Sequence, residues 1–369
     1  MPHLWLRAET KPMEHRAALT PITAKILIEA GFKITVERSD QRIFDDEDYS
    51  KVGCILVDRL HWKTDAPNDA YIVGLKDLPE NDNSPLRHNH IYFGHCYKNQ
   101  SGWKELLGRF EAGKGALLDI EFLKDDQGCR VAAFGYMAGF AGCAITIDIW
   151  CHQKLNPNEE YGAILPYANE DALISYTKDR LARAVTANAN IWPKVMVMGA
   201  LGRCGTGACD FARKTGIPEE SIIQWDIAET RKGGPFPEIL EANIFVSCVY
   251  INQKVSPFIT QELIDRTPDR KLSVICDVSC DTTSPYHPIP IYSINTTFDK
   301  PTLTIQTGSS SLLEVCSIDH LPTLLPRESS DMFSNDLLPT ILALKYREQS
   351  SVWNRAESIF RERLEASKT

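Results

Sequence analysis

The chain has 369 residues, of which 43% are hydrophobic and 24% are charged. A chain of this length and composition folds into two or three globular domains, which excludes a disordered protein and a small disulfide-stapled module. The net charge of −9 argues against a dedicated nucleic-acid binder, so any anionic ligand must be held by local cations.

Short apolar runs alternate with longer helical patterns along the chain, which predicts an α/β fold with parallel sheets flanked by helices. Strands are expected at residues 4–9, 32–37, 54–57, 70–76, 90–97, 116–123, 195–200, 221–226, 243–250, 273–279 and 302–307. Helices are expected at 20–30, 102–110, 140–153 and 171–190, and two amphipathic helices follow Asp331. Thr20 and Pro21 form a helix start, and the proline-rich segment 284–290 reads as a surface connection.

A glycine-rich loop joins the strand expected at 195–200 to the following helix. Its glycines, Gly199, Gly202, Gly205 and Gly207, would let the backbone approach a pyrophosphate at the helix N-terminus. Asp226 ends the next strand about 20 residues later, where a carboxylate can bind the ribose hydroxyls of NAD and repel the 2′-phosphate of NADP. The GxxGxxG spacing is one residue longer than the usual pattern, and glycines that serve only helix packing are the alternative interpretation.

Lys76 and His95 each follow an apolar run, so both are expected at the carboxyl ends of strands, where open α/β sheets bind ligands. A lowered amine pKa would suit Lys76 as a general base, and imidazole is the usual acid–base group near neutral pH. Asp77 and Glu121 are candidates for tuning the pKa values of this pair. A solvated lysine and a hydrogen-bonded structural histidine are the alternative interpretations.

Lys11, Arg16 and Arg130 are candidates for binding substrate carboxylates, because a guanidinium matches a carboxylate through two parallel hydrogen bonds. Each of them taken alone could equally be an ordinary surface charge. His88 and His90 form an HxH pair without a third ligand in evidence, so no metal site is expected.

The 11 cysteines are odd in number and form no CxxC pair, which indicates a reducing compartment. No apolar segment has the length of a secretory signal or a membrane span, so a cytoplasmic protein without a membrane partner is expected. The final residues, Ser-Lys-Thr, resemble a peroxisomal Ser-Lys-Leu signal without its last leucine, which leaves a peroxisomal location open.

Eight segments, spread over nearly the whole chain, carry a resemblance to a known family. They are LRAETKPMEHRAALTP, VGLKDLPE, FGHCYKNQSGW, DIEFLKDDQGCRVAAFGYMAGFAG, GALGRCGTGA, KGGPF, DVSCDTTSPYHPIPIY and SIDHLPTLLPRESS. Together they closely resemble the fungal NAD-dependent, lysine-forming saccharopine dehydrogenases. The N-terminal segment is also similar, more distantly, to alanine dehydrogenase and to the NAD-binding subunit of transhydrogenase.

The resemblance implies an enzyme that converts saccharopine, NAD and water into lysine, 2-oxoglutarate and NADH. Saccharopine carries three carboxylates, which Lys11, Arg16 and Arg130 could bind. By the same resemblance, Lys76 takes the proton from the secondary amine as hydride passes to NAD. His95 then manages the addition of water to the imine and the release of lysine.

Further site residues come from the resemblance alone. Phe134 and Val278 belong to the substrate set, with Val278 between substrate and cofactor. The cofactor set is Gly202 and Arg203 at the pyrophosphate, Asp226 at the ribose, Thr230 and Tyr250 nearby, and Ile318, Asp319, His320 and Leu321 by the nicotinamide half. Two residues depart from the family pattern, because Cys129 replaces an arginine and Asp77 replaces a glutamate.

Cys204 lies inside the glycine loop and Cys248 near the end of the adjacent expected strand, so the two are expected to lie close together. The family resemblance suggests a disulfide between them, which would distort the loop and obstruct NAD. A reducing compartment favours two free thiols instead.

The expected architecture is a pair of Rossmann-like domains, with residues 1–134 and 325–369 binding substrate and residues 135–324 binding NAD. The active site is expected in the cleft between them, which would close around the ligands. The resemblance suggests a monomer. Another amino-acid dehydrogenase of the alanine dehydrogenase type and a non-catalytic dinucleotide-sensing protein are the alternative functions.

Overall fold

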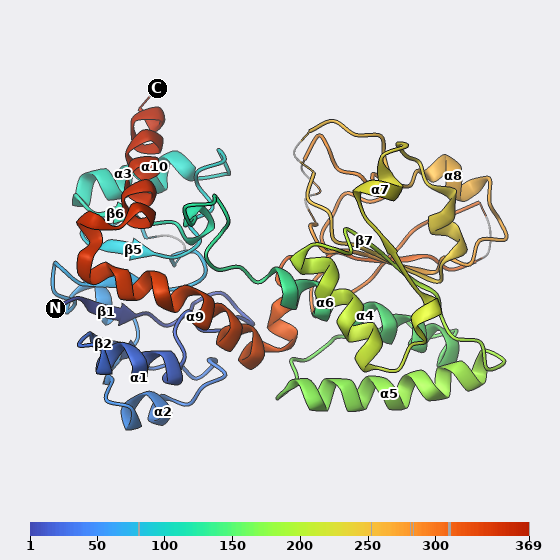
Figure 1. Ribbon diagram of the computed structural model, residues 1–369, viewed down its shortest axis with the longest axis horizontal. Coiled ribbons are helices and arrows are strands. Elements are labelled where there is room, and N and C mark those ends of the chain that lie inside the picture. The colour runs from blue at the N-terminus through green and yellow to red at the C-terminus, as the bar shows by residue number, and fades with distance from the viewer. Residues whose placement is uncertain (80–81, 252, 281, 283, 309–310, 369) are drawn as a thin grey trace. The chain divides into compact units, whose positions relative to one another are not determined.

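The computed structural model describes residues 1–79, 82–251, 253–280, 282, 284–308 and 311–368. The chain divides into unit 1, Met1–Ala133 with Pro326–Thr369, and unit 2, Phe134–Leu325. Each unit contains a six-stranded sheet with helices packed against it (Figure 1). The expected α/β class with two Rossmann-like folds is therefore confirmed.

Unit 1 has a parallel sheet in the order β3-β2-β1-β4-β5-β6. The strand order reverses between β1 and β4, and loops that leave the carboxyl ends of strands at such a point form ligand sites in open α/β sheets. The strands are β1 (His3–Leu6), β2 (Lys33–Glu37), β3 (Ile55–Val57), β4 (Tyr71–Val73), β5 (Asn89–Ile91) and β6 (Ala116–Leu117). The helices are α1 (Pro21–Glu29), α2 (Asp46–Lys51), α3 (Trp103–Gly113), α9 (Pro326–Leu342) and α10 (Ser351–Ser367), with 3-10 turns η1 (His61–Lys63), η2 (Ile120–Phe122) and η6 (Ala343–Gln349).

The C-terminal helices complete unit 1, with α9 in contact with α1 and α10 packed against α3. Thr20 caps α1 and Pro21 is its first residue, as the sequence predicts. The Thr23 hydroxyl accepts the Thr20 N–H at 2.9 Å and lies 2.6 Å from the hydroxyl of Ser334 on α9. The cap of α1 therefore also fixes α9, which begins at Pro326 and thus earlier than expected.

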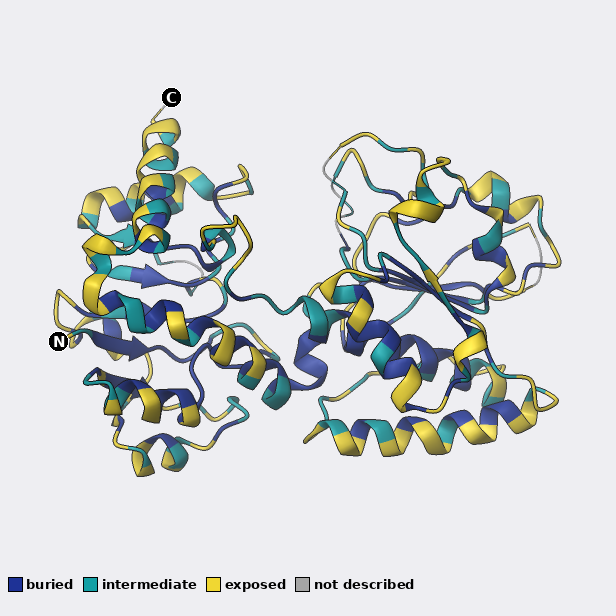
Figure 2. Cartoon of the chain, viewed as in Figure 1, coloured by how far each residue is buried: buried dark blue, intermediate teal, exposed yellow. Residues whose placement is uncertain are grey.

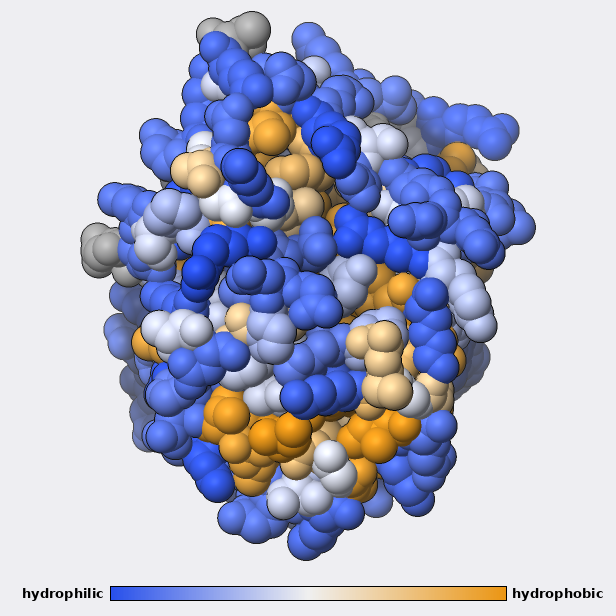
Figure 3. Space-filling view, turned by 90° about the vertical axis from the view of Figure 1, so that its left-hand side faces the viewer, coloured by the Kyte–Doolittle hydropathy of each residue, from blue (hydrophilic) through white to orange (hydrophobic). Residues whose placement is uncertain are grey.

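On the face shown in Figure 3, hydrophilic side chains cover most of the surface and apolar side chains gather in a few patches.

Unit 2 has a sheet in the order β11-β12-β10-β9-β7-β8, parallel except for the pairing of β11 with β12. The strand order reverses between β7 and β9. The strands are β7 (Val195–Met198), β8 (Ile222–Trp225), β9 (Ile244–Ser247), β10 (Val274–Asp277), β11 (Leu303–Thr304) and β12 (Glu314–Cys316). The helices are α4 (Gly135–Leu155), α5 (Glu170–Ala187), α6 (Arg203–Lys214), α7 (Ile227–Thr230) and α8 (Gln261–Asp265), with 3-10 turns η3 (Glu219–Ser221), η4 (Pro237–Glu241) and η5 (Leu321–Leu324).

The longest helix, α4, lies in the core of unit 2, where 13 of its 21 residues are buried (Figure 2). It packs against α6 through two glycines. A Cβ atom on Gly139 would lie 1.8 Å from the carbonyl oxygen of Cys204, and one on Gly207 would lie 2.0 Å from that of Tyr136. Only glycine permits so close an approach of two helices.

The proline-rich segment 284–290 is only partly a surface connection, so that expectation needs correction. Ile289 is fully buried in the core of unit 2. The ring of His287 lies 3.0 Å from the carboxylate of Asp277, which also accepts a hydrogen bond from the Tyr292 hydroxyl at 2.7 Å. A buried carboxylate at the end of β10 therefore draws this segment inward.

Candidate functional site

Four neighbouring strands of unit 1 deliver polar side chains to one edge of the sheet. Arg7 and Glu9 follow β1, and Lys76 follows β4. His95 follows β5, and Asp119 follows β6. Because parallel strands end at the same edge, these side chains gather at the place where open α/β sheets bind ligands. The two candidate catalytic residues thus come from strands that are hydrogen-bonded to each other.

His95 is held by its side chain. Its Nδ1 lies 3.1 Å from a carboxylate oxygen of Asp77, and its ring stacks on Phe93 with centroids 6.4 Å apart. Burial acts to raise the pKa of Asp77, but the hydrogen bond from His95 and nearby positive charges outweigh it, so the pKa is lowered. The ionised carboxylate assigns the proton to Nδ1 and leaves Nε2 of a neutral ring as an acceptor. The shorter side chain of Asp77 therefore still reaches the histidine.

The backbone at Gly94 and His95 is also constrained. His95 has a left-handed conformation with a φ of +47°, which is uncommon for a residue other than glycine. The buried carboxylate of Asp119 accepts hydrogen bonds from the N–H of Gly94 at 3.2 Å and of Glu121 at 2.9 Å. Burial raises the pKa of Asp119 to about 7, although the two backbone bonds and the charge of His95 oppose this shift.

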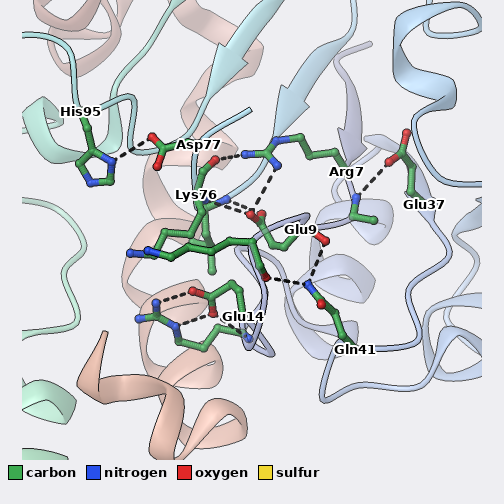
Figure 4. Close-up of polar contacts among 12 residues, drawn as sticks. Arg7, Glu9, Glu14, Glu37, Gln41, Lys76, Asp77 and His95 are labelled. Carbon is green, nitrogen blue, oxygen red and sulfur yellow. Dashed lines mark hydrogen bonds and ion pairs between the residues drawn. The ribbon is translucent and has the colours of Figure 1, made fainter. Parts of the chain in front are cut away.

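Lys76 is held from its backbone by a buried ion pair of Arg7 and Glu9 (Figure 4). The carboxylate of Glu9 accepts the N–H of Leu75 at 2.7 Å and that of Lys76 at 3.0 Å. Arg7 donates to the carbonyl oxygen of Lys76 and lies 3.4 Å from the Glu9 carboxylate. Burial raises the pKa of Glu9, whereas the charge of Arg7 and the two backbone bonds act in the opposite direction.

Arg16 already has a carboxylate partner within unit 1. It is buried and forms two bonds with Glu14, from Nε at 2.8 Å and from Nη2 at 2.6 Å. Burial acts to raise the pKa of Glu14, but the charges of Arg16 and Lys76 outweigh it and the pKa is lowered. The expected substrate cation is therefore part of a charge cluster, while Lys11 is half-buried and acts electrostatically on Asp77.

Glu121 and Arg130 lie near each other after β6. The Glu121 carboxylate is 2.7 Å from the ammonium of Lys98 and 4.0 Å from the guanidinium of Arg130. The sequence predicts neither contact. Phe134, another expected substrate residue, is the N-cap of α4 and the first residue of unit 2.

In unit 2 the glycine loop borders a cleft of about 790 Å³ formed by the ends of β7, β8 and β9. Four of the expected cofactor residues line it, namely Gly202, Asp226, Thr230 and Tyr250. Asp226 accepts the N–H of Leu201 at 3.0 Å with one oxygen and that of Ile227 at 2.8 Å with the other. The capping box of α7 adds the N–H of Glu229 as a third donor, so about one acceptor position of the carboxylate remains for a ribose hydroxyl.

The glycines of this loop have different tasks. Gly199 turns the chain with a φ of +80°, and a Cβ atom on Gly205 would lie 2.1 Å from the Gly199 oxygen. A Cβ atom on Gly202 would meet only the Gly199 oxygen, at 3.4 Å, so the bare backbone at Gly202 borders the cleft. Arg203 begins the 12-residue helix α6, whose N-terminal N–H groups and dipole favour an anion.

Apolar side chains complete the cleft. Ile227, Val249 and Ile251 line it beside Asp226. A cleft with a bare phosphate loop, a carboxylate at the end of the neighbouring strand and an apolar wall fits a dinucleotide. The residues present therefore fit NAD.

Cys204 and Cys248 lie in contact, as expected, and both are free thiols in this structure. The hydrogen bond with Cys204 and, after it, burial raise the pKa of the Cys248 thiol. A disulfide between them is not present here, and its formation stays a prediction.

The segment expected beside the nicotinamide is divided between core and surface. Ile318 and Leu321 are buried in the core of unit 2, so their main chain rather than their side chains would meet a cofactor. Asp319 is 48% exposed and pairs with His320. Val278 follows β10 and packs on the edge of the same core.

The described residues contain no group of three or more His, Cys, Asp or Glu side chains arranged to hold a metal. His90 of the HxH pair packs instead against Trp62 and Phe110, with centroids 5.1 and 5.4 Å away. Across the same described residues, we find no helix with the length and apolar character needed to cross a membrane.

Four residues of this site escaped the sequence reasoning, namely Arg7, Glu9, Glu14 and Asp119. One signal could have found Glu9 and Asp119. Each is a carboxylate just beyond a strand end, of β1 for Glu9 and of β6 for Asp119, and the same strand-end rule predicted Lys76 and His95.

The comparisons with known proteins agree with this geometry. Residues 5–141 match the family described as "Alanine dehydrogenase/PNT, N-terminal domain". Two solved structures share the fold, an L-alanine dehydrogenase (TM-score 0.64, 15% identity, covering 97% of this chain and 93% of that one) and a transhydrogenase from Sinorhizobium meliloti (TM-score 0.65, 14% identity, covering 96% and 97%).

Curated relatives are much more similar. The chain is 58% identical over 360 residues to saccharopine dehydrogenase (NAD(+), L-lysine-forming) of Schizosaccharomyces pombe, with 97% of each chain covered. It is 55% identical over 366 residues to the enzyme of the same name from Emericella nidulans, with 98% of this chain and 97% of that one covered. The chain belongs to the family of NAD-dependent, lysine-forming saccharopine dehydrogenases.

Proposed function

We propose that this chain oxidises saccharopine with NAD and water and releases L-lysine and 2-oxoglutarate. The observation that carries the proposal is the 58% identity to a lysine-forming saccharopine dehydrogenase over nearly the full length of both chains. Its own residues fit the chemistry, since unit 1 presents an amine and an imidazole at one sheet edge and unit 2 presents a dinucleotide cleft.

We assign the first proton transfer to Lys76. NAD, when bound, supplies the acceptor for the hydride that leaves the carbon of the C–N bond. Lys76 takes the proton from the secondary amine nitrogen, so the substrate becomes an imine. The ammonium formed on Lys76 is stabilised by Glu14 and Asp77, two carboxylates whose pKa values its charge helps to lower.

We assign the hydrolysis of the imine to His95. Asp77 holds the proton on Nδ1, so Nε2 can accept the proton of a water molecule that attacks the imine carbon. The same nitrogen passes that proton to the imine nitrogen, which gives a carbinolamine. It then takes the hydroxyl proton of the carbinolamine and gives it to the same substrate nitrogen as the C–N bond breaks. Both protons of the water thus reach the leaving amine of lysine, and the water oxygen becomes the keto oxygen of 2-oxoglutarate.

Binding of the three substrate carboxylates falls to cations of unit 1. Arg130 and Lys11 are partly exposed, whereas Arg16 is buried and paired with Glu14. We therefore assign direct carboxylate contacts to Lys11 and Arg130 and keep Arg16 as an electrostatic contributor. Phe134 and Val278 remain proposed substrate contacts.

The cofactor roles belong to unit 2. We assign Gly202 and Arg203 to the pyrophosphate and Asp226 to the adenine ribose, where its charge disfavours the 2′-phosphate of NADP. Thr230 and Tyr250 line the same cleft. The main chain of 318–321 is proposed for the nicotinamide half, with residues 1–134 and 325–369 as the substrate domain and 135–324 as the NAD domain. We also propose a monomer that works in the cytoplasm.

The test follows NADH absorbance with lysine and 2-oxoglutarate as substrates. Oxidation that requires both substrates would support the proposal, and an NADPH control measures the selectivity given by Asp226. Turnover with pyruvate and ammonia instead would favour an alanine-type dehydrogenase. NADH binding without turnover of either pair would favour a dinucleotide-sensing protein.

A further inference from the structure

We propose that Glu9, held in place by Arg7, is a positioning residue that fixes the backbone from which Lys76 projects. The proposal rests on the proposed function, because it takes Lys76 as the base. Glu9 does not need to touch substrate in this role. It acts through the main chain, and its effect is therefore separable from that of the base itself.

The backbone at Lys76 needs such support because it lies outside the sheet. Strand β4 ends at Val73, and the backbone hydrogen bonds to the β5 chain reach as far as Leu75, whose carbonyl oxygen accepts the N–H of Phe93 at 3.1 Å. Beyond it, the N–H of Lys76 is met by Glu9 and its carbonyl oxygen by Arg7, so both polar groups of the residue are satisfied by one ion pair. The same carboxylate also takes the N–H of Leu75.

The ion pair is itself firmly placed. Arg7 and Glu9 are 3% and 7% exposed, and bonds from backbone N–H groups to an ionised carboxylate are among the stronger hydrogen bonds in proteins. The guanidinium of Arg7 lies 5.4 Å from the ring centroid of Tyr92. A Cβ atom on Gly74 would come within 2.4 Å of Arg7, so the absence of a side chain at Gly74 makes room for the guanidinium.

Both oxygens of Glu9 are engaged. Oε1 accepts the N–H of Leu75, and Oε2 accepts the N–H of Lys76 and the contact from Arg7. This arrangement points to support rather than proton transfer. Because a lysine side chain is long and flexible, displacement of its backbone by about 1 Å can cost about 100-fold in rate.

Glu37 offers a matched control for a substitution of Glu9. It is another fully buried glutamate of unit 1, and it accepts backbone N–H groups of Ala8 at 3.0 Å and Trp62 at 2.9 Å. Figure 4 shows both glutamates, and only Glu9 bonds to the backbone of Lys76.

The experiment compares Glu9→Gln with Glu37→Gln in the full chain. Both variants should lose thermal stability to a similar degree. Only Glu9→Gln should lower kcat for saccharopine oxidation, by about 10- to 100-fold, with KM and the Kd for NADH changed less than about threefold. Equal kcat losses in the two variants, or an unchanged kcat in Glu9→Gln, would overturn the proposal.

A double-mutant cycle tests whether Glu9 acts through the base. In a Lys76→Met background, Glu9→Gln should leave the residual single-turnover rate unchanged, whereas independent effects would multiply. Should Glu9→Gln not fold, Gly74→Ala displaces Arg7 instead and should give the same lowered kcat. Absence of saccharopine turnover in the wild type would contradict the proposed function, while wild-type turnover with full activity in Glu9→Gln and Gly74→Ala would contradict only the positioning role.

Discussion

Lys76 and His95 are supported in different ways. The backbone of Lys76 is bonded to Arg7 and Glu9, whereas the ring of His95 is bonded to Asp77. Since neither support depends on the ammonium of Lys76 or on Nε2 of His95, each functional group can be removed while its supporting contacts remain.

Replacement of Lys76 by methionine should therefore abolish proton transfer without unfolding the protein. We expect kcat for saccharopine oxidation to fall by about 10²- to 10⁴-fold, with an unchanged Kd for NADH. Steady-state rates across pH and fluorescence titration with NADH would measure both. Lys25→Met on the exposed face of α1 serves as the control and should keep full activity. Full turnover of Lys76→Met at every pH would contradict its role as the base.

His90 should make stability depend on pH. It is fully buried, and none of the described residues binds either ring nitrogen, so burial and then the charge of Arg7 hold its pKa well below the usual value. Below about pH 6.5 the unfolded chain takes up a proton that the folded chain does not. The free energy of unfolding should therefore decrease as the pH is lowered below about 6.5, by up to about 1.4 kcal/mol per pH unit from this residue.

The variant His90→Phe keeps an aromatic ring beside Trp62 and Phe110 and removes this titration. Urea unfolding of both proteins at about pH 7.5 and about pH 5.5 measures the effect. The variant should gain stability relative to the wild type at the lower pH. An equal loss in the two proteins would show that other groups control the pH dependence.

At the scale of elements, the glycine contact between α4 and α6 has a direct energetic consequence. Gly207→Ala would place a Cβ atom 2.0 Å from the Tyr136 oxygen, and overpacking of this kind costs about 1–3 kcal/mol. Gly108 on α3 is the matched control, because it is also inside a helix and a Cβ atom there would meet nothing within 4 Å. Gly108→Ala should therefore stabilise by about 0.5–1 kcal/mol.

Thermal unfolding of the two glycine variants distinguishes the effect of close helix packing on stability from the effect of helix propensity. We expect a lower Tm for Gly207→Ala and a raised Tm for Gly108→Ala, since alanine favours helix at both positions and only the neighbours differ. If both variants gained stability, the close contact between α4 and α6 would not constrain the fold.

Most elements could be predicted from the sequence because buried strands appear as short apolar runs. All eleven expected strands occur, and Lys76 and His95 follow from the rule that ligands bind at strand ends. Strand β12 escaped because its three residues, Glu314–Cys316, begin with a charged side chain. The bonds of Arg7 and Glu9 to the backbone of Lys76 could not be predicted, because only the strand order places β1 beside β4.

Side-chain partners were harder to predict than backbone elements. Asp77 was expected only to tune the pKa values of Lys76 and His95, and its hydrogen bond with His95, 18 residues away in sequence, comes from the structure. The bidentate bond of Arg16 with Glu14 depends on a local turn that leaves no periodic signal. Contacts made by such irregular backbone cannot be read from apolar patterns.

At the scale of the whole molecule, each unit repeats one plan. The strand order reverses once in each sheet, and the polar residues of the candidate site follow the strands beside that point. Solved structures at 14–15% identity share the fold over nearly the full chain, so this plan tolerates extensive change of sequence.

The proposed monomer makes a prediction about mass in solution. Exposed large apolar side chains of unit 1 include Ile22, Ile55 and Leu60, and single apolar side chains are common on protein surfaces. Size-exclusion chromatography with light scattering should give the mass of one chain at every concentration tested. A mass that doubles with rising concentration would show self-association and contradict the monomer.

The site residues lie in loops beyond the strand ends. Substitutions that change the reaction can therefore occur without substitutions in the strands of the sheet. Loops after β1, β4, β5 and β6 carry the polar groups, while the strands themselves carry the apolar core. Exchange of those loops with loops of equal length from distant relatives should therefore redirect substrate choice while the sheet persists. The fold is therefore a suitable scaffold for laboratory evolution of enzymes that oxidise other amines.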